Sequence, residues 1–225
     1  MSSTQVVKTA LSEHKVIPDV LPETIDPSYE LTIHWPNATL DTPGKKLACE
    51  DTRPEPTITI KPTPTEPLTN LVLIMADPDL MKTNDTNTGQ VRHWLATNLT
   101  SNPDGTLSHF AAAERSPYVR PAPLPDARPH RYVFILARPA SNSKVEVRPE
   151  DLRAMQTAFP MAVSGTQGAA QDLKDRWGFD AGRLCEEKGL RVLGVNFMRV
   201  EGTRESLQAN LGLMGEAAVD KAVGK

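Results

Sequence analysis

Hydrophobic residues that alternate with polar ones mark several half-buried strands along the chain. Apolar side chains at every second position are typical of a strand with one face in the core and the other in water. The strands predicted from this spacing contain Leu31, Ile33 and Trp35; Ile58 and Ile60; Val145 and Val147; and Val195 and Phe197. The chain is therefore expected to be rich in β-structure.

Three further stretches combine an apolar body with a polar group at one end. Residues 71–75 form a continuous apolar run of strand length, closed by the turn formers Asp77, Pro78 and Asp79. A second strand is predicted at His93–Thr97 and a third at His130–Leu136, each beginning with a histidine. A short continuous apolar run is typical of a strand buried on both faces. We expect the polar ends of these strands to meet at one rim of a sheet.

A three- to four-residue period predicts helices outside these strands. The predicted helices are Thr4–Lys15, a helix that begins at Pro149, Trp177–Lys188, and a helix capped by Thr203 that carries Leu207, Leu211, Met214 and Ala218 along one side. This last apolar stripe favours docking on the same domain, with a partner-binding helix as the alternative.

Length and composition indicate one globular domain. The chain has 225 residues, of which 39% are hydrophobic and 24% charged, with no linker that would divide them. Its 20 prolines are about twice the usual share of ~5%, which favours loops and strand ends over long helices. The formal net charge of −3 gives no electrostatic case for binding nucleic acid or an anionic membrane surface broadly.

The two cysteines and the chain ends add little. Cys49 and Cys185 are expected to be buried fillers, since two cysteines imply neither a disulfide framework nor a zinc knuckle. We find no apolar core of a signal peptide and no apolar run of ~18 residues, so a cytoplasmic protein without a transmembrane segment is expected. No cofactor is indicated.

The polar residues at the predicted rim form a candidate binding site. Asp77, Asp79, His93, His130 and Tyr132 bring carboxylates near imidazoles, and two histidines with a phenol can donate hydrogen bonds to a phosphate or carboxylate. Alternatively, Asp77 only caps a turn and the histidines are satisfied core residues. A metal site of Asp and His ligands and acid–base chemistry by a histidine also remain open.

Two long motifs carry a family resemblance. The first is Asp77-Pro78-Asp79 followed by His93-Trp94-Leu95-Ala96-Thr97, and the second is Tyr118-Val119-Arg120-Pro121-Ala122-Pro123 followed by His130-Arg131-Tyr132-Val133-Phe134. Residues 116–129, which include the first part of the second motif, contain five prolines and are expected to form either a rigid wall or a simple connection. These motifs resemble the phosphatidylethanolamine-binding protein family, especially its fungal carboxypeptidase-Y-inhibitor-like branch. The resemblance covers roughly residues 16–200.

The resemblance implies a mainly β fold, a single-domain β-sandwich with a few peripheral helices and a small anion-binding site at one end. It divides the chain into a helical segment at 1–15, the family domain at 16–200, and a C-terminal helix and tail at 201–225. The ligand-binding residues that it implies are Asp77, Asp79, His93, Arg120, Pro121, Pro123, His130 and Tyr132. Among these, Asp79 would support the turn, and the two prolines would lie in the wall.

Two departures from the family pattern bear on the ligand. Leu80-Met81-Lys82-Thr83 follows Asp79 where the family has Ala-Pro-Ser-Arg, and Arg120 stands where the wall commonly has glycine. Three functions stay open: a non-enzymatic binder of a small anionic ligand or phospholipid head group, an inhibitor of a serine carboxypeptidase or another protein partner, and a fungal biosynthetic protein that acts on an anhydride or dicarboxylate metabolite. The binder is the first hypothesis.

Overall fold

A computed structural model describes residues 3–79, 89–108, 114–125, 128–156 and 176–208. The helices are α1 (Ser3–Glu13), α2 (Val16–Asp19), η1 (Glu50–Thr52), α3 (Pro149–Gln156) and α6 (Ala181–Glu187). The strands are β1 (Glu30–His34), β2 (Thr39–Leu40), β3 (Lys45–Lys46), β4 (Thr57–Lys61), β5 (Leu71–Asp77), β6 (Val91–Ser101), β7 (Leu107–Ser108), β8 (Glu114–Ser116), β9 (His130–Pro139) and β10 (Leu190–Val200).

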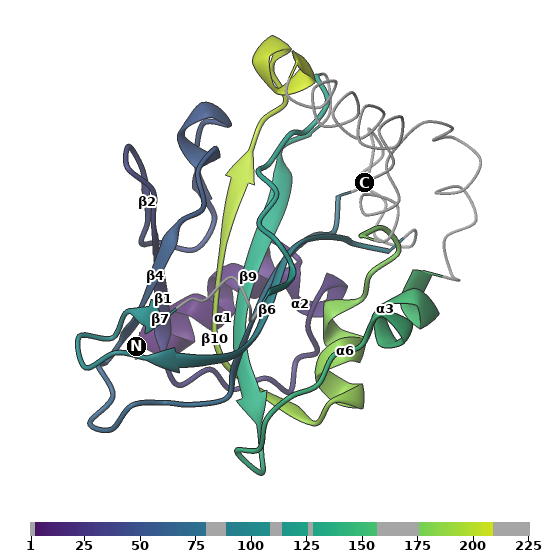
Figure 1. The fold of residues 1–225 in the computed structure, drawn as a ribbon. Helices are drawn as coiled ribbons and strands as arrows, with labels where there is room; N and C mark the ends of the chain where they lie inside the picture. Colours follow the sequence, from purple (N-terminus) through teal and green to yellow (C-terminus); the bar gives the residue numbers. More distant parts are fainter. Residues whose placement is uncertain (1–2, 80–88, 109–113, 126–127, 157–175, 209–225) are drawn as a thin grey trace.

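Two sheets form the body of the protein. The larger has the strand order β3-β10-β9-β5-β6-β7, with β8 paired to β6, and the smaller has the order β2-β1-β4. In Figure 1 the small sheet lies to the left of the large one, while α3 and α6 lie to its right. The predicted mainly β fold with a few peripheral helices is therefore confirmed.

The central strand β5 explains why two cores form. All seven of its residues are buried, as the continuous apolar run predicted. Leu73 and Met75 face the small sheet, in an inter-sheet core that also contains Ile33, Trp94 and Tyr132. Because side chains alternate along a strand, Val72, Ile74 and Ala76 face the opposite side. There they join a helix-side core, whose members include Val72, Ile74, Leu11, Phe179 and Leu184.

The amino-terminal helix belongs to the helix-side core. Helix α1 confirms the predicted helix at Thr4–Lys15 to within two residues at its end, and its Val7 and Leu11 are buried against the large sheet. Val6, on the other face of α1, is 51% exposed. Helix α1 thus packs directly on the sheet-containing part of the described chain.

Two predicted elements differ from the observed ones. The helix predicted at Trp177–Lys188 begins only at Ala181, because Asp180 has extended backbone angles and its carboxylate accepts the N–H of Arg183 as an N-cap. The preceding Phe179 pairs instead with Gln90 as an isolated β-bridge. No strand forms at Val145 and Val147, although both are buried.

Val145 has a side chain as its partner in place of a neighbouring strand. The amide of Asn98 donates to its carbonyl at 3.1 Å and accepts its N–H at 2.9 Å. Cys49 and Cys185 are buried and unbridged, as predicted. Of the helix predicted after Thr203, the described part ends at Gln208, so Leu211, Met214 and Ala218 lie outside the described residues. No helix in the described part of the chain is long and apolar enough to cross a membrane.

Candidate functional site

Asp77 and His130 form a buried pair where β5 ends and β9 begins. Nδ1 of His130 donates to Oδ2 of Asp77 at 2.8 Å, and each side chain is only 6% exposed. The other oxygen, Oδ1, accepts the N–H of Asp79 at 2.7 Å. Burial acts to raise the pKa of the Asp77 carboxyl, but the charge and hydrogen bond of His130, with smaller contributions from His93 and Asp79, hold it below its usual value. Asp77 is thus an ionised anchor for His130.

His93 reaches the same place through an irregularity in β6. Met75 of β5 lies opposite Trp94, and Ala76 lies opposite Arg92, so His93 is an extra residue in a β-bulge. In an unbroken strand, Arg92 and Trp94 would point to the same side. The bulge separates them, because Trp94 belongs to the inter-sheet core whereas the Arg92 guanidinium lies 5.4 Å over the ring of Phe179 on the helix side. Bulges commonly redirect a side chain beside a functional site.

The bulge places the His93 ring against Tyr132. Its centroid lies 5.0 Å from that of Tyr132 in an edge-to-face arrangement, and Tyr132 stacks on His130 at 6.3 Å. Burial raises the pKa of the Tyr132 hydroxyl well above its usual value, and the carboxylate of Asp77 raises it further. Tyr132 therefore keeps its proton and can serve as a hydrogen-bond donor.

The protonation of His93 follows from its partner. Its Nδ1 lies 2.8 Å from the carbonyl oxygen of Val119. Because a carbonyl only accepts hydrogen bonds, Nδ1 carries the proton, and the neutral ring has an unprotonated Nε2. Burial lowers the pKa of His93, against the opposing effect of Asp77, and Arg176 lowers it further. Among the described residues, no hydrogen bond to Nε2 of His93 is found, so this atom can serve a ligand.

Asp79 faces away from these rings. The backbone N–H of Arg131 donates to its Oδ2 at 2.8 Å, Nε of Arg131 donates to the same oxygen at 2.9 Å, and Nη2 donates to Oδ1 at 2.6 Å. Both carboxylate oxygens are thus engaged by one arginine. This geometry agrees with the expected role of Asp79 in supporting the turn.

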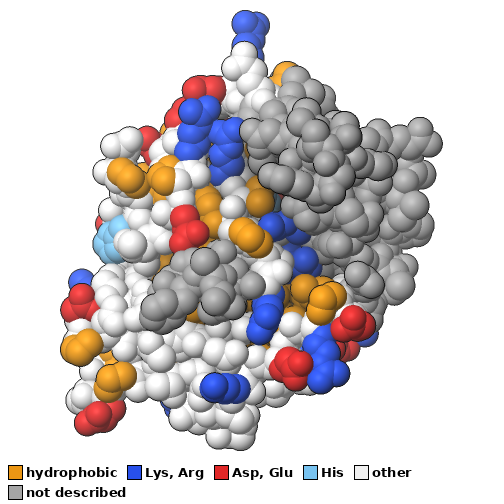
Figure 2. All heavy atoms as spheres, viewed as in Figure 1, with side chains coloured by type: hydrophobic (Ala, Val, Ile, Leu, Met, Phe, Trp, Pro, Cys, Tyr) orange, Lys and Arg blue, Asp and Glu red, His pale blue; other side chains and the backbone are white. Residues whose placement is uncertain are grey.

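The predicted wall is pinned to other parts of the chain. The hydrogen bonds that hold it include Cys49 Sγ to the Pro121 carbonyl at 3.1 Å, Ser206 Oγ to the Pro123 carbonyl at 2.6 Å, and Tyr118 Oη to the Thr52 carbonyl at 2.6 Å. Pro121 and Pro123 are buried, and Arg120 between Val119 and Pro121 is half-buried. Figure 2 shows Lys and Arg side chains scattered over this face among acidic and hydrophobic ones.

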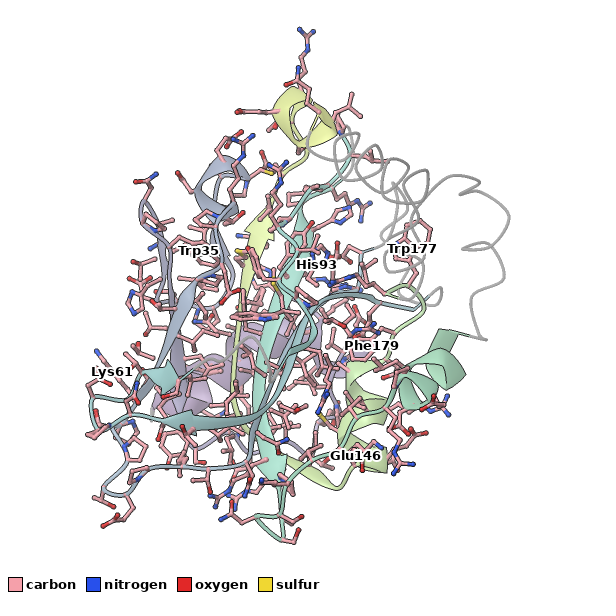
Figure 3. All side chains as sticks on the ribbon, in the orientation of Figure 1. Trp35, Lys61, His93, Glu146, Trp177 and Phe179 are labelled. Atoms are coloured by element: carbon pink, nitrogen blue, oxygen red, sulfur yellow. The ribbon has the colours of Figure 1, made fainter. Side chains whose placement is uncertain are left out.

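Two buried arginines beside His93 were not found from the sequence. Nη1 of Arg176 donates to the carbonyls of Arg92, His93 and Pro117 at 3.3, 3.2 and 2.9 Å. Nε of Arg92 donates to Oγ of Ser116 at 2.6 Å. Figure 3 shows His93 between the small sheet and the side of the molecule where Trp177 and Phe179 lie. No periodicity or motif marks Arg176, which could be found only from the fold.

The predicted residues therefore divide into three groups. Asp77, His93, His130 and Tyr132 come together, Asp79 supports them through Arg131, and Arg120, Pro121 and Pro123 lie in the wall. Within the described part of the chain, no group of three His, Cys, Asp or Glu side chains is arranged to hold a metal ion.

Comparison with known proteins identifies the family of this chain. The sequence profile of the phosphatidylethanolamine-binding protein family matches residues 18–172. The chain belongs to this family. The match contains the Asp77, His93, His130 and Tyr132 positions, and it confirms the resemblance predicted from the two motifs.

Several relatives cover nearly the whole chain. A Saccharomyces cerevisiae protein, the uncharacterized protein YLR179C, is 25% identical over 210 residues, which are 90% of this chain and 96% of that protein. The structure of carboxypeptidase Y inhibitor, solved with its cognate proteinase, aligns with a TM-score of 0.64 at 20% identity over 90% of this chain and 98% of the inhibitor. The phosphatidylethanolamine-binding protein of Plasmodium vivax aligns with a TM-score of 0.61 at 19% identity, over 88% and 98% of the two chains. These structures share the fold.

Proposed function

We propose that this protein binds the phosphate or carboxylate group of a small molecule at the His93–Tyr132 site, without catalysing a reaction. The observation that carries the proposal is the use of the histidine nitrogens. His93 directs Nδ1 to the carbonyl of Val119, which leaves its Nε2 as the ring nitrogen for a ligand, and Nδ1 of His130 beside it is held by Asp77. The Tyr132 hydroxyl, which stays protonated, lies next to them and is hydrogen-bonded to the Asp77 carboxylate.

Binding of an anion at this site should take up a proton. The pKa of His93 is lowered in the free protein, so the ring is neutral at pH 7. A nearby negative charge favours the protonated ring and raises that pKa in the complex. By linkage, affinity rises as pH falls from the pKa of His93 in the complex toward its lower pKa in the free protein.

Isothermal titration tests this proposal directly. Phosphoethanolamine, a phosphate monoester and a dicarboxylate are titrated into the wild type, His93→Ala and His34→Ala at pH 7. His34 is a suitable control, since it is half-buried on β1 and contacts Thr59 of the small sheet at 3.1 Å. We expect binding that weakens about tenfold or more in His93→Ala, because a hydrogen bond to a charged group is lost, and that is unchanged in His34→Ala.

Two results would contradict the proposal. One is binding that His93→Ala leaves intact. The other is an observed enthalpy that does not depend on the ionisation enthalpy of the buffer, since that dependence measures proton uptake. A preference for the dicarboxylate would support the alternative of a biosynthetic protein that acts on an anhydride or dicarboxylate metabolite. Assays for turnover of that compound would then test this alternative.

Inhibition of a serine carboxypeptidase is a second candidate, favoured by the fold shared with carboxypeptidase Y inhibitor. Deleting residues 1–15 is an unsuitable test, because Leu11 is fully buried in the helix-side core. The exposed Val6 offers a better one, since Val6→Glu alters the surface of α1 and leaves its buried face intact. Loss of inhibition in Val6→Glu, with folding retained by circular dichroism, would support this function. Absence of inhibition by the wild type would exclude it for the carboxypeptidase tested.

A further inference from the structure

One side chain joins the amino-terminal segment to the turn beneath the site. The Nε and Nη2 groups of Arg131 donate to Asp79, as described above, while Nη1 donates to the carbonyls of His14 and Lys15, both at 2.9 Å, and to Oδ2 of Asp19 at 2.8 Å. The Arg131 side chain is only 11% exposed. Its planar guanidinium fits such fixed, multiple contacts in a way that a lysine ammonium cannot.

The chain turns sharply where Arg131 meets it. Lys15 lies between α1 and α2 with a left-handed backbone, φ 53°. The carbonyls at the end of a helix lack intrahelical partners and carry partial negative charge. Arg131 donates to the carbonyls of His14 and Lys15, just after the end of α1, and the Lys15 carbonyl also accepts the N–H of Asp19 at 3.3 Å. The docked position of the segment 14–19 therefore depends on this cation.

Hydrogen bonds then run without a break from Asp19 to His130. Asp19 binds Arg131, Arg131 binds Asp79, the N–H of Asp79 binds Asp77, and Asp77 binds Nδ1 of His130. The distances along this path lie between 2.6 and 2.8 Å. Displacement of the segment 14–19 would leave Arg131 with fewer fixed partners, and Asp79 and Asp77 would lose part of their orientation.

We propose that Arg131 is a positioning residue that couples docking of the segment 14–19 to the orientation of the Asp77–His130 pair, and through it to ligand binding. The part that concerns ligand binding rests on the proposed function, whereas the coupling to His130 does not. Because such coupling is reciprocal, a ligand at the site should hold the segment 14–19 more firmly by the same factor by which docking improves affinity. The amino-terminal segment would then respond to occupancy of the site.

The test uses the full-length protein with three variants. Asp19→Asn removes the charge at the far end of the path, and Arg131→Lys keeps the charge but loses the forked contacts. Asp151→Asn is the matched control. It removes a similarly part-buried ion pair in which Oδ2 of Asp151, in α3, lies 2.6 Å from Nζ of Lys188. Neither Asp19 nor Asp151 belongs to the proposed ligand site.

The first measurement needs no ligand. The Nδ1–H proton of His130, which is held by Asp77, should give a slowly exchanging NMR signal in the wild type. We expect that signal to weaken through faster exchange in Asp19→Asn and Arg131→Lys and to be unchanged in Asp151→Asn. Amide hydrogen exchange at Asp19 and Val20, whose N–H groups bond to Lys15 and Val16, should accelerate in the first two variants.

The second measurement is the affinity for phosphoethanolamine by isothermal titration. We expect the affinity of Asp19→Asn to be about five- to tenfold lower, in line with typical coupling between sites. In the wild type, the ligand should slow amide exchange at Asp19 and Val20 by the same factor. Unchanged His130 signals in both Asp19→Asn and Arg131→Lys would overturn the coupling, whether or not the wild type binds the ligand. A wild type that binds none of the ligands, with altered His130 signals in these variants, would instead refute only the proposed function and the ligand-dependent part.

Discussion

Replacing Asp77 by asparagine removes the negative charge beside His130 and keeps nearly the same side-chain shape. The asparagine oxygen can still accept the N–H of Asp79, which lies 2.7 Å from Oδ1 in the wild type. Its amide, however, would face Nδ1 of His130, so two donors would meet where a donor and a carboxylate now lie 2.8 Å apart. His130 must then adopt the other tautomer or lose its partner.

The magnitude follows from what is lost. A hydrogen bond to a charged group contributes about 1.5–3 kcal/mol, and relief from burying a carboxylate offsets part of it, so we expect Asp77→Asn to lower the free energy of unfolding by about 2 kcal/mol. For a chain of this size, the midpoint of thermal unfolding should fall by roughly 4–8 °C. Equilibrium urea unfolding at pH 7 measures the difference.

The pH dependence provides an independent check. The pKa of Asp77 in the folded protein lies below its unfolded value of 3.8, so its stabilisation is present above pH 3.8 and is lost as the pH falls through the folded pKa. The gap between wild type and Asp77→Asn should thus narrow as the pH falls below 3.8 and through the lower pKa of Asp77 in the folded protein. Asp104→Asn, at an exposed turn, should change stability much less. A variant as stable as the wild type at pH 7, or a gap that persists at low pH, would refute this account of the anchor.

Two further substitutions test how the site is supported. A Cβ at Gly202 would lie 1.9 Å from the carbonyl oxygen of Leu124, so Gly202→Ala should separate the chain at 203–208 from the wall, cost about 1–3 kcal/mol, and accelerate hydrogen exchange at Ser206. Normal exchange and stability in this variant would contradict the contact. Asn98→Ala should cost about 1–2 kcal/mol in urea unfolding, because it removes both bonds to Val145. Asn98→Gly separates this loss from backbone strain, since the residue has φ 59°, and it should be the less destabilising of the two. The reverse order would rule out a contribution from backbone strain, and an Asn98→Gly variant as stable as the wild type would show that the bonds to Val145 contribute little.

Much of the fold could be predicted because its core strands follow simple rules. The run 71–75 is apolar at every position, and it became the central strand β5, buried on both faces. The histidine at the start of β9 and the aspartate at the end of β5 were expected to meet, and they form the Asp77–His130 pair. Polar residues at strand ends are therefore informative when the strands themselves are unambiguous.

Other features depend on events that hydrophobic periodicity does not record. The bulge at His93 inserts one residue into β6, and no apolar pattern distinguishes it from a regular strand. The buried Val145 looks like part of a strand, although its backbone bonds to the side chain of Asn98. The late start of α6 reflects local competition, in which Asp180 is better placed as a cap than inside a helix. Arg176 is held by backbone carbonyls, whose positions only the tertiary structure defines.

The three residues at the start of β9 illustrate how regular and irregular strands combine at this site. Tyr132 lies in the inter-sheet core, so strand alternation places His130 on the same face and Arg131 on the helix side, where it meets the amino-terminal segment. A single short stretch thus connects the rings of the site to the layer that contains α1 and α2. On β6 the same alternation would send His93 to the helix side, away from Tyr132, and the bulge reverses that. A one-residue deletion that removed the bulge opposite Met75 and Ala76 would therefore turn His93 away from Tyr132, so the site depends on this one extra residue.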